Sequence, residues 1–301
     1  MHGLPFSSNP LLVHQCGDFI IADFQDSTVN NIDDKTVKSF GDEWKNFNQF
    51  NDEDIKTAGD QYFDIVSEKI LGKDKISLDL GCGSGRWTKY LAPHVGFIEA
   101  IDPSEAVFAA ARLLKGISNV RITKASADNI PFSNDSFDFI FSLGVLHHVP
   151  DTLRAIQSAV KKLKRNGYFH LYLYYNLDNR GPVFHFLFHL SNFFRKIISS
   201  LPPIGKRFIC DTIALFVYVP FVLLAKLLRV LRIEAYNNIP LSFYIDKRFY
   251  IIRNDALDRF GTPLEQRFSR ENIRKMMEKA GLTEIIFSEH APYWHAIGKK
   301  I

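Results

Sequence analysis

The residues with the clearest chemical use in this sequence are three glycines at alternate positions, Gly81, Gly83 and Gly85. Glycine has no Cβ, so the backbone can turn sharply and a ligand can lie against bare main chain. An apolar run at residues 75–80 predicts a strand before these glycines, and residues 86–91 predict a helix after them. We therefore expect a small molecule to bind at the carboxyl end of that strand, where open α/β sheets bind their ligands.

The spacing of the glycines argues against two common nucleotide sites. The dinucleotide fingerprint G-x-G-x-x-G needs a third small residue at position 86, where this chain has Arg86. A phosphate-binding P-loop needs Lys followed by Ser or Thr after its last glycine, and that pair is absent. A nicotinamide-dependent oxidoreductase is therefore disfavoured.

Acidic residues follow the next two predicted strands. Asp102 ends the strand predicted at residues 97–101, and lies about 20 residues beyond the glycines, where a carboxylate can accept hydrogen bonds from ribose hydroxyls. The alternative is that Asp102 only serves the start of the following helix. Asp128 follows the strand predicted at residues 120–124; taken alone, Asp128-Asn129 is an ordinary turn pair.

Two adjacent histidines are candidates for proton transfer. His147 and His148 follow residues 136–144, an apolar run typical of a buried parallel strand. Imidazole accepts a proton near neutral pH, and we expect His148 to be the one that faces a substrate. The alternative is that one ring only packs and the other hydrogen-bonds main chain. Rival pocket residues follow the strand predicted at 167–175: Tyr174, Tyr175 and Asp178.

Bulk properties exclude several classes of protein. The net charge is only +4 over 301 residues, so we expect no nucleic-acid partner. The three cysteines are far apart and form no C-x-x-C, which disfavours a zinc ribbon or a disulfide framework. No H-x-x-H or carboxylate cluster indicates a metal site. The first residues lack a basic segment followed by an apolar run, so we expect a cytoplasmic protein.

Taken together, these motifs resemble those of the class I S-adenosylmethionine (SAM) dependent methyltransferases. D-x-G-x-G-x-G at residues 79–85 is similar to their first motif, and F-D-x-I-x-S-x-x-V-L-H-H-V-P-D at residues 137–151 resembles the ubiquinone/menaquinone-biosynthesis-like branch, methyltransferase type 11. The resemblance covers about half of the chain, residues 58–175 and 268–301. It implies SAM as the cofactor.

The resemblance also implies roles for individual residues. Asp102 would bind the ribose, and Asp128 the adenine amino group. The implied cofactor-binding residues are Asp79, Gly81, Cys82, Gly83, Asp102, Pro103, Ala127, Asp128, Asn129 and Leu143, and the candidate catalytic residues are His148, His147 and Tyr175.

The fold implied is a Rossmann-like, seven-stranded, doubly wound α/β sheet whose last strand is antiparallel. Residues 1–57 would form an N-terminal extension, of which we expect residues 1–38 to be extended or loop-like. An aromatic stripe at helical spacing follows, and would either fold over the cofactor or only pack on the core. The stripe consists of Phe40, Trp44, Phe47 and Phe50.

Residues 176–267 predict a mainly helical insert between the fifth strand and the last helix. Residues 183–201 are amphipathic at helical spacing, and residues 213–231 are apolar nearly all round. Residues 182–232 carry seven basic side chains and one acidic one. The uncharged run 212–225 has 14 residues, fewer than the roughly 20 that span a bilayer. The insert would contact a membrane surface, cap the pocket or form a dimer interface.

The sequence therefore predicts a methyltransferase acting on a small, apolar or lipid-like acceptor. The protein must align acceptor and methyl group at about 3–3.5 Å and remove a proton where the acceptor carries one. The alternatives are a non-catalytic SAM-binding partner subunit and a membrane-associated scaffold. Peripheral membrane contact through residues 182–232 stays open, as does the acceptor atom.

Overall fold

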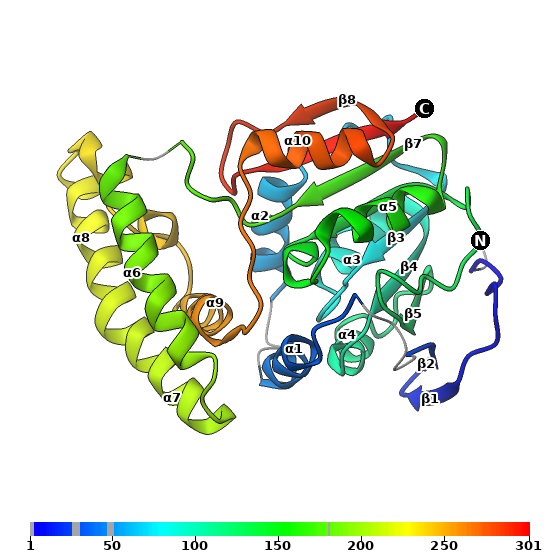
Figure 1. Cartoon of the computed structure of the whole chain (residues 1–301), viewed down its shortest axis with the longest axis horizontal. Helices are drawn as coiled ribbons and strands as arrows, with labels where there is room; N and C mark the ends of the chain where they lie inside the picture. Colours follow the sequence, from blue (N-terminus) through cyan, green and yellow to red (C-terminus); the bar gives the residue numbers. More distant parts are fainter. Residues whose placement is uncertain (1–2, 26–30, 47–50, 180) are drawn as a thin grey trace. The chain divides into compact units, whose positions relative to one another are not determined.

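The computed structural model describes residues 3–25, 31–46, 51–179 and 181–301. The chain divides into two compact units (Figure 1). Met1–Asp178 and Leu264–Ile301 form the first, which we call the α/β unit. Asn179–Pro263 form the second, the helical unit. Each unit has its own apolar core and is described by itself.

The described part of the α/β unit contains a nine-stranded sheet in the order β1-β2-β5-β4-β3-β6-β7-β9-β8. The strands from β2 to β7 in this order run parallel, and β9 is antiparallel to both of its neighbours. The bounds are β1 Leu12–Cys16, β2 Phe19–Asp23, β3 Gly72–Leu80, β4 Val95–Asp102, β5 Val120–Lys124, β6 Phe137–Leu143, β7 Leu163–Tyr172, β8 Leu282–Phe287 and β9 His295–Lys300.

Helices cover both faces of this sheet, which is why its central strands are apolar on both sides. In β6, Phe139 and Ile140 point to opposite faces, and both are fully buried. One face packs against α5 and α10, and the other against α2, α3 and α4. The bounds of the helices in this unit are α1 Asp34–Asn46, α2 Asp52–Tyr62, α3 Arg86–Leu91, η1 Ala92–His94, α4 Ala106–Leu113, η2 Leu146–His148, α5 Thr152–Lys162 and α10 Arg270–Lys279.

The seven strands from β5 to β8 in the sheet order form the expected Rossmann-like core, with β9 antiparallel between β7 and β8. The expectation that residues 1–38 are extended or loop-like was wrong in part, because α1 begins at Asp34. Residues 12–23 are extended, and they form a hairpin that adds two strands to the sheet. Gly17 adopts a φ of +58° at its turn, and β2 pairs in parallel with β5. The hairpin was missed because several of its apolar side chains are exposed, so the strands lack a clear alternating pattern.

The helical unit has a small core of its own. Cys210, Ala214, Tyr218 and Val222 recur every four residues and face Ala256 in α9. The first predicted helix ends at Ile198, three residues before the expected end. The bounds are α6 Pro182–Ile198, α7 Pro203–Ile213, the wide π turn η3 Ala214–Tyr218, α8 Val219–Val230, η4 Glu234–Asn238, η5 Ser242–Tyr244 and α9 Phe249–Gly261.

Candidate functional site

The glycine loop follows β3 and wraps around the end of β4. The main-chain N–H groups of Gly81 and Cys82 both donate to Ile101 O, at 2.8 and 2.9 Å. Gly81 adopts a φ of +83°, and a Cβ placed there would lie 2.3 Å from Val145 Cγ1. Only glycine therefore fits at position 81, because any side chain would collide with the loop that follows β6.

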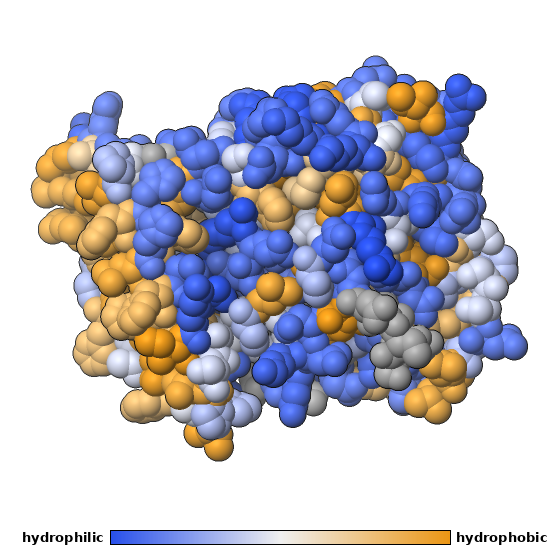
Figure 2. Space-filling view, viewed as in Figure 1, coloured by the Kyte–Doolittle hydropathy of each residue, from blue (hydrophilic) through white to orange (hydrophobic). Residues whose placement is uncertain are grey.

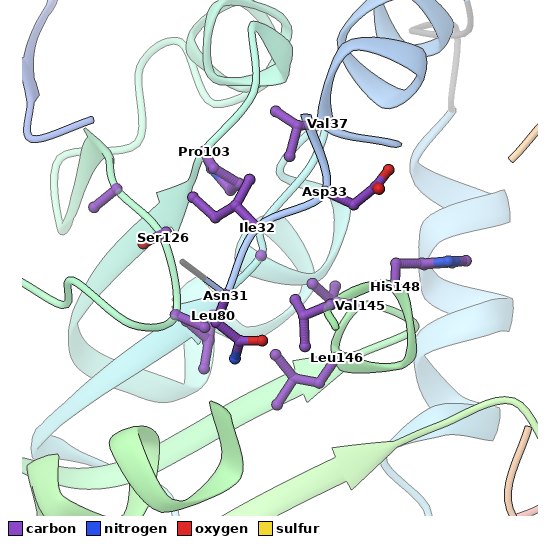
Figure 3. Close-up of a pocket in the computed structure, with 14 residues that line it drawn as sticks. Asn31, Ile32, Asp33, Val37, Leu80, Pro103, Ser126, Val145, Leu146 and His148 are labelled. Carbon is purple, nitrogen blue, oxygen red and sulfur yellow. The ribbon is translucent and has the colours of Figure 1, made fainter. Parts of the chain in front are cut away.

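A cavity adjoins Gly81 at the carboxyl ends of β3, β4, β5 and β6 (Figure 3). It encloses about 410 Å³ of space free of protein atoms, a volume that includes open solvent at its mouth. In Figure 3, Pro103 and Ser126 lie on one side, and the His148 ring points away from them. The lining residues are Asn31, Ile32, Asp33, Val37, Leu80, Gly81, Pro103, Ala125, Ser126, Ala127, Val145, Leu146, His148 and Val149.

The N-terminal extension forms one wall of this cavity. Asn31 is buried, and its side chain bridges the main chain of Asp151: Asp151 N donates to Asn31 Oδ1 at 2.6 Å, and Asn31 Nδ2 donates to Asp151 O at 2.9 Å. Asp33 Oδ1 accepts from Thr36 N at 2.8 Å, which satisfies a backbone donor at the start of α1. The segment of residues 31–37 is thus fixed against the start of α5.

The aromatic stripe of the extension is described only in part. The Phe40 ring lies against the His148 ring, with centroids 4.8 Å apart. Phe47, Phe50 and the side chain of Trp44 lie outside the described residues.

Asp102 connects the glycine loop to the end of β4. Its Oδ2 accepts from Gly83 N at 2.9 Å, and its Oδ1 accepts from Ser104 N at 2.8 Å and Ser104 Oγ at 2.6 Å. The bonds to Ser104 correspond to the alternative role at the start of the next helix. Burial raises the pKa of this carboxyl. A carboxylate accepts about four hydrogen bonds, so it has capacity for one more donor.

Asp128 does not line the cavity, whereas the two residues before it do. Its Oδ2 pairs with Arg154 Nη2 at 2.7 Å, and its Oδ1 accepts from Asn31 Nδ2 at 3.3 Å. Asn129 Nδ2 donates to Phe24 O at 2.9 Å, so this side chain too engages the N-terminal extension. Ser126 lines the cavity, but the sequence analysis did not predict it as a binding residue and named the charged Asp128 instead.

Four of the expected cofactor residues are buried and lie outside the cavity lining: Asp79, Cys82, Asp102 and Leu143. Thr88 Oγ1 donates to Asp79 Oδ2 at 2.6 Å, joining β3 to α3. Burial raises the pKa of Asp79 from 3.8 to about 7. Burial also raises the pKa of the Cys82 thiol well above its ordinary value, so the thiol is neutral.

His148 is the one of the three candidate catalytic residues that lines the cavity. Its Nδ1 lies 2.7 Å from Leu264 O. A carbonyl oxygen can only accept, so Nδ1 carries the hydrogen and the neutral ring has its lone pair on Nε2. The contact therefore selects the tautomer in which Nε2 can accept a proton.

His147 is fully buried and lies outside the cavity lining. It stacks on Tyr174, with centroids 3.9 Å apart, and neither ring nitrogen has a hydrogen-bond partner among the described residues. Burial, followed by the charges of His148 and Arg267, holds its pKa well below the ordinary value. His147 is therefore a neutral packing residue in this structure.

Tyr175 also lies outside the cavity lining. Its main chain bridges to Phe268, its carbonyl accepts from Arg267 Nη1 at 3.2 Å, and its ring faces Tyr293. The described residues contain no group of three or more side chains suited to hold a metal ion.

The segment of residues 264–268 is a further part of the site that the sequence did not reveal. Leu264 N donates to Thr36 Oγ1 at 3.1 Å, and Gln266 Nε2 donates to Val149 O at 2.6 Å. Phe268 N donates to Tyr174 O at 2.9 Å. This segment therefore joins α1, the His147-His148 turn and the end of β7.

Part of this chain is similar to known methyltransferases. A family described as methyltransferase domain matches residues 78–171. The uncharacterized methyltransferase YcgJ of Bacillus subtilis is 28% identical over 151 residues, which cover 49% of this chain and 59% of that protein. A demethylmenaquinone methyltransferase of Staphylococcus epidermidis is 26% identical over 148 residues, covering 48% and 58%. The chain thus spans less than two thirds of these curated relatives.

Among solved structures, a SAM-dependent methyltransferase from Aquifex aeolicus has a TM-score of 0.44 at 16% identity, over 83% of this chain and 98% of that one. The strand order and the matched domain define a class I SAM-dependent methyltransferase fold. Residues 78–171 match this methyltransferase family, and the match implies SAM as the cofactor. The resemblance seen in the sequence is confirmed.

Proposed function

We propose that this protein is an active SAM-dependent methyltransferase and that the cavity beside Gly81 is its SAM site. The observation that carries the proposal is the cavity's place at the carboxyl ends of four parallel strands, bounded by a glycine that tolerates no side chain. SAM supplies a methyl group activated by its positively charged sulfur.

The residues present fit such a ligand. Ile32, Pro103 and Val145 give the cavity apolar walls suited to a flat base, and Ser126 adds a hydroxyl. Asp102 keeps acceptor capacity for a ribose hydroxyl. Because Ser126 and Ala127 line the cavity and Asp128 does not, we propose that Ser126 and Ala127 contact the adenine, and that Asp128 holds Asn31 in place.

We assign the general base to His148. It lines the cavity away from Pro103 and Ser126, and its Nδ1 bond to Leu264 O leaves Nε2 as the proton acceptor. Proton removal by a positioned imidazole typically contributes about 10²–10⁴-fold in rate. The hydrogen bond that His148 Nδ1 donates to Leu264 O orients this ring, whereas His147 is fully buried outside the cavity lining.

The acceptor in this proposal is a small, apolar or lipid-like molecule. Two relatives are named demethylmenaquinone methyltransferase and ubiquinone biosynthesis O-methyltransferase, and both names refer to quinone pathways. The exposed apolar side chains of the helical unit suit such a molecule. A cytoplasmic enzyme that meets its acceptor at a membrane surface fits both observations.

Calorimetry followed by isotope transfer tests the proposal. We expect SAM to bind and NAD not to bind. We then expect a labelled methyl group to pass from SAM into a quinone or lipid extract. Absence of SAM binding contradicts the proposed site. Binding without transfer, across extracts of varied polarity, identifies a non-catalytic SAM-binding protein instead.

A further inference from the structure

The helix α6 turns its apolar stripe to solvent. Phe186, Leu190 and Phe193 are 67%, 45% and 60% exposed. On the inward side, Arg195 is 5% exposed and donates to Thr262 O at 2.9 Å and Pro263 O at 3.0 Å. An amphipathic helix of a protein in water normally does the reverse. The exposed stripe is Val183, Phe186, Leu187, Leu190, Phe193, Phe194 and Ile197.

The long helix formed by α7, η3 and α8 is also largely uncovered. Pro203–Val230 spans 28 residues, and only 28% of its most apolar stretch is buried. Of the 27 exposed large apolar side chains among the described residues, 19 lie at residues 183–233. Figure 2 shows the corresponding concentration of apolar surface on the helical unit. Surface of this kind and extent marks an interaction site.

By length and composition this long helix could cross a membrane, but its packing argues for a contact in the plane of the surface. Its uncharged run of residues 212–225 is about 21 Å long at 1.5 Å per residue, against a hydrocarbon core of about 30 Å. Asp211 forms a two-point ion pair with Arg253 of α9, at 2.9 and 2.6 Å. A spanning helix would draw α9 and its charges into hydrocarbon, which is strongly unfavourable.

Charge distinguishes between the partners that could cover this surface. Residues 182–232 carry seven basic residues and one acidic residue, and the cations Lys196, Lys226 and Arg232 are exposed. In a two-fold dimer the same basic surface meets itself, so positive charges would be brought near positive charges. An anionic lipid surface instead attracts basic residues beside an embedded apolar face.

We propose that the exposed faces of α6 and of Pro203–Val230 dock the protein in the plane of an anionic phospholipid membrane. This inference deepens the proposed function, because a docked enzyme can receive a lipid-like acceptor from the bilayer. Only the identity of the acceptor rests on the proposed function; the membrane contact itself does not. The side of the unit that carries α9 remains in water.

Vesicle flotation of the full chain tests the proposal, with phosphatidylcholine vesicles and with vesicles that also contain about 30% phosphatidylglycerol. We expect at least about tenfold more protein to float with the anionic vesicles, and the excess to fall at about 0.5 M salt. The variant Phe186→Glu/Phe193→Glu should lose about tenfold in flotation, because two apolar anchors become anionic.

The matched control is Leu12→Glu/Val13→Glu, which alters side chains of 61% and 59% exposure in the β1 strand of the α/β unit. It should float like the wild type. SAM affinity, measured by calorimetry on every variant, should be unchanged, so a failed cofactor site is recognised separately from failed docking.

Three results would overturn the proposal. One is equal flotation of the wild type and the α6 variant. Another is resistance of the bound protein to alkaline carbonate extraction, which indicates a spanning helix. The last is a dimer in lipid-free sedimentation that the α6 variant converts to monomer, which identifies a second copy as the partner.

Discussion

At the scale of single residues, Gly81 is required for two reasons, its positive φ and the lack of space for a Cβ, and substitutions can separate them. Gly81→Ala introduces a strained backbone, at a φ of +83°, and a collision with Val145. Gly116 has the same φ, but a Cβ there would meet nothing within 4 Å. We expect Gly116→Ala to cost about 1–2 kcal/mol and to leave SAM binding intact. Gly81→Ala should cost more and weaken SAM binding at least about tenfold, as measured by urea unfolding and calorimetry.

A double substitution tests the predicted collision between a Cβ at position 81 and Val145. In Gly81→Ala/Val145→Ala the obstructing methyl groups are gone, so the difference in unfolding free energy from Gly116→Ala should shrink. If Gly81→Ala binds SAM as tightly as the wild type, the glycine loop does not border the cofactor site.

Asp79 should make stability depend on pH. Its pKa rises from 3.8 to about 7 on folding, so between these values the folded state holds a proton that the unfolded state has lost. This contribution to stability is complete below about pH 4 and is lost as the pH rises toward 7. Asp79→Asn keeps an acceptor for Thr88 and removes the titration.

Relative to the wild type, Asp79→Asn should therefore gain stability as the pH rises from 5 to 7, by at most about 1.4 kcal/mol per pH unit. Urea unfolding across this range measures the difference. A difference that stays constant with pH shows that Asp79 does not titrate in this window.

His148 should matter for turnover rather than for cofactor affinity. His148→Asn keeps a side-chain N–H near Leu264 O but has no basic nitrogen, so kcat should fall about 10²–10⁴-fold while the Kd for SAM stays the same. The matched control is His147→Phe, which preserves the stacked packing on Tyr174 and should retain activity. The opposite pattern, with a folded but inactive His147→Phe, transfers the role of base to His147.

At the scale of elements, the N-terminal segment should control cofactor affinity through Asn31. Asn31→Ala removes both hydrogen bonds to the main chain of Asp151. Losing them costs about 1–3 kcal/mol in total, and we expect the Kd for SAM to rise about tenfold, since the segment forms one wall of the cavity.

Asn31→Asp is the sharper variant. It keeps the acceptor for Asp151 N but replaces the donor with a charge beside Asp128, and should bind SAM more weakly than Asn31→Ala does. Calorimetry compares the two. Equal affinity for the wild type and both variants contradicts a role for this segment in closing the site.

The sequence predicted the elements with local signals and missed those held by distant contacts. The glycine loop and the strand before His147 follow from residue type and spacing. Asn31 hydrogen-bonds Asp151, which lies 120 residues further along the chain, and no periodicity in either segment predicts that contact. Ser126 was passed over because a charged neighbour, Asp128, offered a stronger chemical reason.

At the scale of the whole molecule, two units with separate cores should respond separately to mutation. Arg195→Met leaves the Thr262 and Pro263 carbonyls without their charged donor, at a cost of about 2–3 kcal/mol to the helical unit. We expect faster amide hydrogen exchange in α6 and α9, with SAM binding unchanged.

The neighbouring cation provides the control for this change. Lys196 is exposed, so Lys196→Met should leave exchange rates as they are. If Arg195→Met instead accelerates exchange throughout the α/β unit, the two units unfold as one cooperative body.

The hydrogen bond from His148 Nδ1 to Leu264 O links a single side chain to the boundary between the two units. Leu264 is the first residue after the helical unit, and its carbonyl decides which nitrogen of the His148 ring is basic. A pull of little more than an ångström on that peptide group would break the bond and let the proton move to Nε2, which leaves an imidazole unable to deprotonate a substrate from that nitrogen. With His148 as the proposed base, tension on the chain where it returns from the helical unit would thus stop proton removal by changing the tautomer of this one ring.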